Sequence, residues 1–361
     1  MKSHIEPIQE LILKRQCFNN KAVSFIAKKE WTIMASRTER QILFFELTIK
    51  ASSRRKEFKA YDGLTPPSAR ELFRAIELTH RKQKFIIPIA HGSKSVYFQD
   101  MKVSNEKAIF LVNLSDRDAA DPIFSDPEID SHRVARRKGN EGVEGSAHIV
   151  INLDPVRTDT YAVVIESTAG LSSTRLSQFL GLYVRKAKKE FPSEFVANDP
   201  SGEIDKNGEF KKIPIMVRLD LIGQPSEQLI RDINEGTLTG LEVITVHPAS
   251  SKWDEHGYVV EKSHTATLDI AGVKSSRGKN WAILGEVFKS ATKRDMDQIR
   301  VRFKSNTGVN RSVMIDPATG RTLLDDAYIK KEILGGFKRQ LESAYDKIHP
   351  ELTERMFKHI E

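Results

Sequence analysis

One stretch, residues 145–191, constrains the fold of this chain more than any other. Apolar side chains alternate with mixed ones along residues 148–153 and again along residues 161–166. Because successive side chains on a strand point to opposite faces, each segment predicts a strand with one strongly apolar face and one mixed face. Residues 176–191 instead repeat their apolar side chains at helical spacing. The stretch therefore predicts two strands and a long amphipathic helix, the core of a soluble α/β or α+β domain.

Two turns divide this stretch. Asp154 and Pro155 are predicted to break the first strand, because proline has no N–H to give to a β-ladder. Ser172 or Ser173 can cap the first N–H groups of the helix, so the preceding turn is explained as an ordinary serine-capped one. Free N–H groups at a helix start can also hold an anion such as phosphate, and that alternative stays open.

The length of the chain, 361 residues, allows two domains. Residues 192–212 are rich in Pro, Gly, Asn, Asp and Lys, which is typical of a connection between domains. We therefore predict an N-terminal α+β domain at residues 1–200 and a C-terminal α+β domain at residues 201–361, the latter with a basic strand and a helical tail. The predicted fold class is α+β, with two domains built on mostly antiparallel sheets with packed helices.

Apolar periodicity predicts further elements on both sides of this boundary. A helix is expected to open with Thr65 as its cap and Pro66 and Pro67 in its first turn. Residues 115–140 are polar and lack a periodic pattern, which predicts a long surface loop; a disordered connection is the alternative. The other predicted elements are helices at 6–16, 226–234, 281–293 and most of 325–361, and strands at 31–34, 41–49, 85–89, 95–98, 108–114, 215–221, 241–246 and 258–261.

Composition excludes several classes of protein. The single cysteine, Cys17, rules out an intramolecular disulfide framework and any site with several cysteine ligands. A run of about 18 apolar residues, the length that a membrane span needs, does not occur in the sequence. The N-terminus also lacks the apolar core of a signal peptide. We therefore expect a cytoplasmic protein without a membrane span.

Charge is distributed unevenly along the chain, whose formal net charge is +8. Residues 1–90 hold 18 Lys and Arg against 9 Asp and Glu, and residues 271–361 hold 18 against 12. Residues 91–270 hold 21 against 28. If the two basic ends converge in space, they form a surface able to attract phosphate backbones. A solvated surface with charge pairing between domains is the alternative.

The sharpest local pattern lies at residues 299–304. As a strand, this segment turns three apolar side chains inward and the three cations Arg300, Arg302 and Lys304 to the other face. Cations side by side on a sheet face are candidate phosphate contacts. A solvated basic edge strand, which resists aggregation, is the alternative. The cations predicted to assist in nucleic-acid binding are Arg277, Lys279, Arg136, Arg137 and Lys138.

Familiar nucleotide-binding and hydrolase motifs do not occur in the sequence. Residues 272–280 resemble a P-loop only superficially, because five residues rather than four separate Gly272 from Gly278. Asn280 also stands where a P-loop needs Ser or Thr to bind magnesium. A P-loop nucleoside triphosphatase is therefore rejected.

Two sets of side chains could still support phosphodiester cleavage. His91, His132 and His148 could meet as acid–base groups, although a hydrogen-bonded structural role is favoured for His148. The acidic residues at 116–121 could bind a metal ion, although a solvated acidic loop is favoured. Enzymatic activity stays open, and we predict neither a cofactor nor a metal site.

Residues 141–151, EGVEGSAHIVI, together with Ile165, Glu166 and the turn at 169–172, resemble an uncharacterised bacterial family found among mobile-element and phage-defence genes. The resemblance covers about 30 residues. It implies a role in defence and supplies no catalytic residues.

These observations favour a protein that binds nucleic acid, either DNA or RNA, through basic surfaces without evident catalysis. A nuclease that uses histidines or a metal ion is the first alternative. A protein-interaction module is the second, with its basic ends bound to acidic partners or to other copies of the chain.

Overall fold

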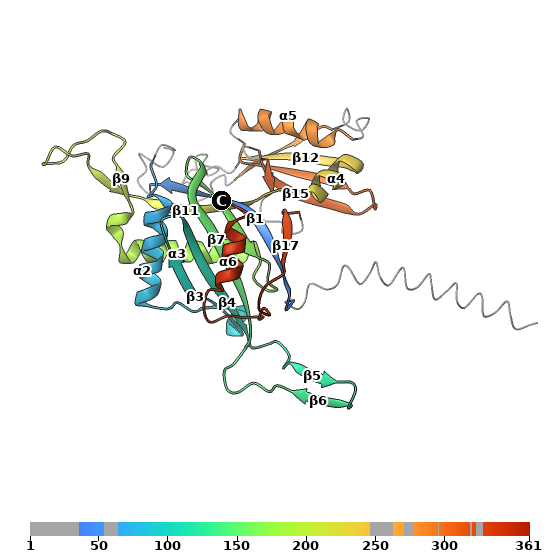
Figure 1. Ribbon diagram of the computed structural model, residues 1–361. Coiled ribbons are helices and arrows are strands. Elements are labelled where there is room, and N and C mark those ends of the chain that lie inside the picture. Colours follow the sequence, from blue (N-terminus) through green and yellow to red (C-terminus); the bar gives the residue numbers. More distant parts are fainter. Residues whose placement is uncertain are drawn as a thin grey trace, which may run out of the picture.

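The computed structural model describes residues 36–53, 64–245, 263–270, 278–294, 296–317, 320–322 and 328–361. The predicted helix at 6–16, the predicted strands at 31–34 and 258–261, and Arg277 lie outside these ranges. The described chain combines antiparallel sheets with packed helices (Figure 1), which confirms the predicted α+β class.

One antiparallel sheet runs through most of the described chain, and β1 (Glu39–Ser52), which is dense in strand-forming residues, lies near its middle. One edge of β1 pairs with β8 (Thr160–Glu166). Its other edge is shared by β17 (Lys331–Gly335) and β11 (Met216–Gly223). Beyond β8 the sheet continues through β7 (Val143–Arg157), β4 (Lys107–Asp116), β3 (Lys94–Val103) and β2 (Ile87–Ile89).

Two amphipathic helices, α2 (Ala69–Lys82) and α3 (Ser173–Glu190), cover one face of this sheet and share its largest core cluster (Figure 1). Phe98 is fully buried there. Its ring centroid lies 5.4 Å from that of Phe110, 4.6 Å from that of Phe179 and 4.3 Å from that of Tyr183. The apolar side of the helix predicted in the 145–191 stretch thus packs on the strongly apolar faces of the strands before it.

The helix starts confirm one predicted cap and correct another. The Ser172 side chain accepts the Arg175 N–H at the start of α3, as one of the two predicted caps. Thr65 is not the cap of α2: Ser68 and Glu71 form a reciprocal capping box, and the two prolines precede the helix. A capping box satisfies two backbone N–H groups at once, which explains why the helix begins at the serine.

The predicted strand break at Asp154 and Pro155 is wrong. β7 continues to Arg157, and its pairing with β8 shifts register between Ile151 and Pro155. A bulge of this kind accommodates a proline, because the bulged position needs no ladder hydrogen bond.

The predicted helical tail is also wrong in its first half. Residues 331–335 form β17, which fills the part of the β1 edge that β11 leaves free. Residues 336–349 are irregular, and Pro350 opens helix α6 (Pro350–Phe357) rather than interrupting one. α6 packs on the second face of the central sheet, opposite α2 and α3.

A second core cluster lies in the later part of the chain. Its strands follow the order β13 (His264–Leu268), β12 (Thr237–Thr245), β14 (Gln298–Lys304), β15 (Asn310–Asp316), and β16 (Arg321–Thr322) joins them to β11. Helices α4 (Glu227–Glu235) and α5 (Asn280–Thr292) pack on one face of these strands. The division near residue 200 stays a prediction, while strands from both sides of it pair with β1.

Two short hairpins project from this framework (Figure 1). One consists of β9 (Val196–Asn198) and β10 (Lys212–Pro214). The other consists of β5 (Ile123–Asp126) and β6 (Ser131–Val134), and it occupies the middle of the segment predicted as a long loop. None of the helices in the described ranges is both long and apolar enough to span a bilayer.

Candidate functional site

The basic strand predicted at residues 299–304 is β14, and its side chains point as the alternation requires. Ile299, Val301 and Phe303 are fully buried against α4 and α5. Arg300, Arg302 and Lys304 therefore lie on the face opposite α4 and α5. β14 is an interior strand between β12 and β15, so protection of a sheet edge does not explain these cations.

Glu242 on β12 lies between the two arginines of this face. Its Oε2 is 2.7 Å from Nη1 of Arg300, and its Oε1 is 2.6 Å from Nη2 of Arg302. The arginine side chains remain 37% and 50% exposed, whereas Glu242 is 12% exposed. Two cations thus share one carboxylate. Lys304 adds a third cation to this face, and Asp316, which follows the buried Ile315 on β15, adds a second carboxylate.

Lys279, another of the predicted contacts, lies beside the helices. It directly precedes α5, whose first residue, Asn280, donates to the Gly236 carbonyl at 3.3 Å. Gly236 in turn lies so close to the Lys304 backbone that an added Cβ would sit 2.4 Å from the Lys304 carbonyl oxygen. Lys279 and Lys304 therefore lie at the same end of the sheet.

The three predicted loop cations follow β6 and differ in their environments. Arg137 is bound at the root of the hairpin: its Nε lies 2.5 Å from Oδ1 of Asp121, and its Nη1 donates to the Arg117 carbonyl at 2.8 Å. This arginine therefore connects the segment after β6 to the segment that follows β4. Arg136 and Lys138 are exposed, and their roles in phosphate binding stay predictions.

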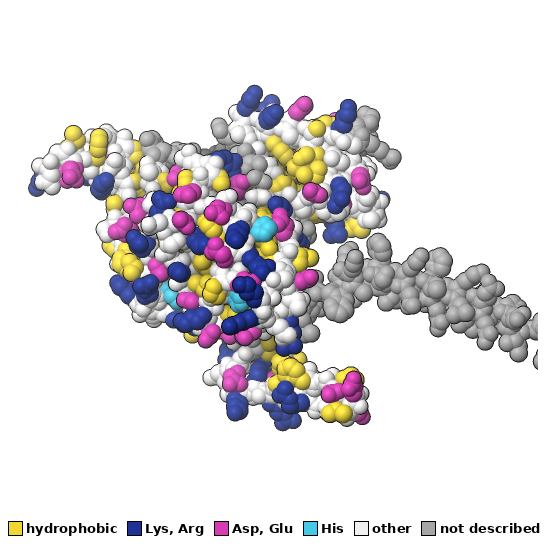
Figure 2. All heavy atoms as spheres, in the orientation of Figure 1, with side chains coloured by type: hydrophobic (Ala, Val, Ile, Leu, Met, Phe, Trp, Pro, Cys, Tyr) yellow, Lys and Arg dark blue, Asp and Glu magenta, His cyan; other side chains and the backbone are white. Residues whose placement is uncertain are grey.

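Charges of both signs are interspersed on the described part of the face shown in Figure 2. Figure 2 shows Lys and Arg side chains alternating with Asp and Glu side chains on one face of the body, rather than gathered into a single basic patch. Lys94 pairs with Asp116 at 2.6 Å, and Lys107 pairs with Glu354 at 2.7 Å. Among the described residues, the open face of β14 is therefore a more specific candidate than the basic surface as a whole.

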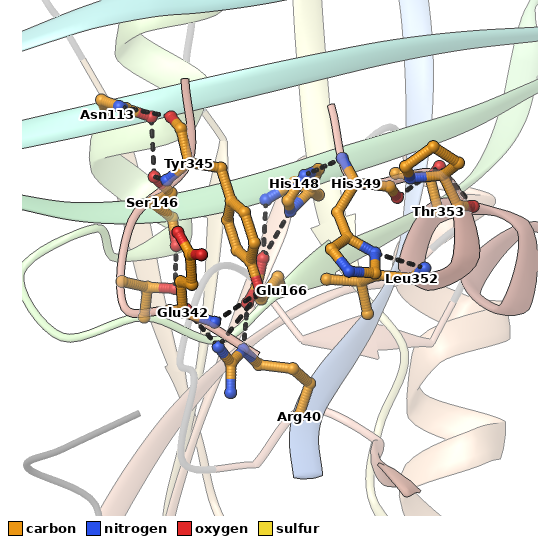
Figure 3. Close-up of polar contacts among 12 residues, drawn as sticks. Arg40, Asn113, Ser146, His148, Glu166, Glu342, Tyr345, His349, Leu352 and Thr353 are labelled. Carbon is orange, nitrogen blue, oxygen red and sulfur yellow. Dashed lines mark hydrogen bonds and ion pairs between the residues drawn. The ribbon is translucent and has the colours of Figure 1, made fainter. Parts of the chain in front are cut away.

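A buried polar cluster, centred on Glu166 at the end of β8, lies on the second face of the central sheet (Figure 3). Glu166 is 2% exposed, Arg40 4% and His148 0%. Glu166 Oε1 accepts the Arg40 Nε–H at 2.7 Å, and Oε2 accepts the His148 backbone N–H at 3.1 Å and lies 2.7 Å from its Nδ1. The buried carboxylate is thus held by one cation and two further donors, as a stable buried charge requires.

The irregular segment before α6 closes over this cluster (Figure 3). The His349 N–H donates to His148 Nε2 at 3.1 Å, so Nε2 carries no proton and Nδ1 donates to Glu166. Tyr345 donates its N–H to Ser146 Oγ at 2.8 Å and accepts the Asn113 side chain at 2.9 Å through its carbonyl. The sheet side chains therefore satisfy backbone groups that an irregular segment leaves without partners of its own.

Two ionisable groups of this cluster make the stability of the fold depend on pH. Burial opposes ionisation of Glu166, but the hydrogen bond from His148 and the charge of Arg40 hold the pKa of this carboxyl below its ordinary value. Burial lowers the pKa of His349, whose Nδ1 accepts the Leu352 N–H and caps α6. Both groups release a proton more readily in the folded state, so their contribution to stability is full above the ordinary pKa and is lost as pH falls.

We expect the free energy of unfolding to decline from about pH 6.5 downward through His349, and further below about pH 4.3 through Glu166. Denaturant titrations at a series of pH values would measure this decline. The matched variant is His349→Asn, because asparagine can cap α6 but does not titrate. It should lose the first part of the decline, and a profile identical to that of the parent chain would contradict this assignment.

The histidines predicted as possible acid–base groups lie on separate elements. His148 is enclosed in the cluster, so it does not face a substrate, and the favoured structural role matches its contacts. His91 lies in a turn before β3, and His132 lies exposed on the β5–β6 hairpin. Within the described ranges, no group of three or more His, Cys, Asp or Glu side chains is placed to hold a metal ion.

The turn before α3 has the serine-capped form and borders a hollow of about 360 Å³. The Arg175 guanidinium, which lines this hollow, donates to the Gly170 carbonyl. Anion binding at this helix start stays a prediction.

Sequence reasoning missed the cluster around Glu166. The one signal was that Glu166 and His148 occupy the mixed faces of two otherwise apolar strands, and nothing in the pattern indicated that Tyr345 and His349 would pack there.

Comparisons with known proteins found no match among family models, curated proteins or solved structures.

Proposed function

We propose that this protein binds nucleic acid on the face of β12, β14 and β15 that lies opposite α4 and α5. The observation that carries the proposal is the row of Arg300, Arg302 and Lys304 on an interior strand. Alternate residues of a strand lie about 6.7 Å apart, so the row presents three cations along one line. Such a row can follow the phosphates of a single strand without reading its bases.

The polar character of the neighbouring positions supports the same proposal. By register, Ser312 on β15 lies opposite Arg302, and Asn310 lies opposite Lys304. Thr267 on β13 lies opposite Glu242. Hydroxyl and amide side chains donate to phosphate and sugar oxygens, so Arg302 and Lys304 each have a neighbour of matching chemistry, whereas Met314 lies opposite Arg300. The setting in bacterial defence rests only on the resemblance of residues 141–172.

Removal of two cations should weaken binding. We expect Arg302→Gln combined with Lys304→Gln to lower affinity for a labelled single-stranded oligonucleotide by about tenfold or more. The slope of log affinity against log salt should also become shallower by roughly 1.5, since each lost contact releases fewer counterions. Arg300 still pairs with Glu242 in this variant, which protects the fold. Fluorescence anisotropy between about 50 and 200 mM salt would measure both quantities.

Glu242→Gln should act in the opposite direction. This change removes the carboxylate that both arginines contact, which frees their guanidinium groups for phosphate, and binding should tighten several-fold. The control is Arg231→Gln with Lys289→Gln, which removes the same charge from exposed positions of α4 and α5. The proposal is wrong if the Arg302→Gln/Lys304→Gln variant and this control lose the same affinity. It is also wrong if neither that variant nor Glu242→Gln changes the affinity for the oligonucleotide.

A further inference from the structure

The C-terminal ends of α2 and α3 meet in a basic joint, formed by residues 77–86 and 185–191. The first range holds three Lys and Arg against one Glu, and the second holds four against one. Each helix C-terminus carries about half a negative charge from its dipole, which offsets only part of this excess. The joint is therefore a positively charged region on the side of the central sheet that the two helices cover.

Both acids of the joint already have partners. Glu77 Oε1 lies 2.8 Å from Nη2 of Arg81, and Glu190 Oε2 lies 3.2 Å from Nζ of Lys82. These pairs leave five further cations of the joint without a carboxylate from the joint itself. An anionic partner of the whole chain would therefore be attracted to this region.

Three lysines of the joint lie over half-buried aromatic rings. The distances from Nζ to the ring centroid are 3.7 Å for Lys186 over Phe85, 4.6 Å for Lys82 over Phe191 and 4.1 Å for Lys84 over Tyr97. A lysine ammonium is a point charge on a flexible stem, so a phosphate can draw it aside and uncover the face of the ring. Each pair therefore offers a cation and a flat apolar surface at the same place.

The three pairs lie next to one another, because residues 82–85 contribute to all of them. Tyr97 lies one residue beyond the part of β3 that pairs with β2. Val96 and Phe98 are buried on the helix side, so the Tyr97 ring points to the other side of the sheet, where its hydroxyl donates to Glu144. The pairs therefore form a path that runs from the joint round the edge of the sheet.

We propose that this path binds a single strand of nucleic acid, with the three lysines on phosphates and the three rings stacked against bases. A nucleic acid supplies both anions and planar groups, whereas an acidic peptide or an anionic membrane supplies only the charge. Cations combined with aromatic rings hold single strands without sequence preference. The inference rests on the proposed function for its partner class, and it adds a surface that contacts bases to the β14 row, which contacts phosphates.

Base stacking distinguishes the two surfaces. The probes are a labelled oligothymidylate of about twelve nucleotides and an abasic oligonucleotide of the same length. The parent chain should bind the first about tenfold or more tighter, because stacking contributes only when bases are present. Phe85→Leu combined with Phe191→Leu should lower this ratio several-fold, while leucine keeps an apolar side chain against the core. The Arg302→Gln/Lys304→Gln variant should weaken binding of both probes and leave the ratio unchanged.

The cations of the path are tested separately. Lys82→Gln, Lys84→Gln and Lys186→Gln together should weaken binding of both probes by about tenfold, because phosphate contacts are lost. The Arg231→Gln/Lys289→Gln variant is again the charge control, and fluorescence anisotropy would measure every affinity. Thermal unfolding would show which variants are folded. The lysine variant removes no core side chain, so it decides the matter if the ring variant fails to fold.

Four results would overturn the proposed path. They are equal affinity of the parent chain for the two probes, a folded ring variant that keeps the ratio, a lysine variant that binds as the parent does, and a lysine variant that loses no more affinity than the charge control. If instead the Arg302→Gln/Lys304→Gln variant alone binds as the parent does, the β14 face is wrong and this path stands. A parent chain that binds neither probe would overturn both proposals.

Discussion

We expect the Glu166→Ala variant to have a free energy of unfolding about 3–5 kcal/mol below that of the parent chain. The substitution leaves the Arg40 guanidinium buried without its carboxylate and removes the acceptor of two His148 N–H groups. An uncompensated buried charge costs far more than a lost surface ion pair. Urea titration followed by circular dichroism would measure the difference.

A surface glutamate supplies the control for this prediction. Glu354 also pairs with a cation, Lys107, but its side chain is 58% exposed. Water solvates either partner when the other is removed, so Glu354→Ala should leave the midpoint of unfolding nearly unchanged. If the two alanine variants unfold at the same denaturant concentration, the buried cluster does not stabilise the fold as we argue.

The Met356→Asp variant is expected to lose the docking of α6 altogether. Met356 is fully buried and packs with Ile42, Phe44 and Val150 on the second face of the central sheet. Truncation of such a side chain costs about 2–5 kcal/mol, and burial of a carboxyl in its place adds a further penalty. The sum approaches the total stability of an ordinary domain. Limited proteolysis should therefore release the segment after β17, or the protein should fail to fold.

The matched control is Lys347→Asp, which introduces the same side chain at an exposed position of the same segment. Resistance to proteolysis should be retained in this variant, because no apolar contact is lost and the new carboxylate stays in water. Equal protease resistance of the Met356→Asp variant and the parent chain would show that α6 does not hold the segment on the sheet.

The candidate nucleic-acid face was predictable from sequence only in its orientation. The alternation from Ile299 to Lys304 correctly placed Arg300 and Arg302 on the face opposite the core. It did not indicate that Glu242, more than fifty positions earlier, would lie between them. Cross-strand partners depend on how separate strands pair, and an alternating pattern within one strand contains no information about its neighbour.

The sequence by itself determined the local elements with strong periodicity: β1, β7, β8, α3 and β14 lie where apolar spacing predicted them. Spacing decides these elements because a strand or helix must bury one face whatever it packs against. Only the tertiary structure decided that residues 331–335 form a strand on β1, and that the segment ending at His349 covers Glu166 and His148. Neither segment has a strong preference of its own. Each takes its conformation from backbone edges and polar side chains that the rest of the fold leaves without partners.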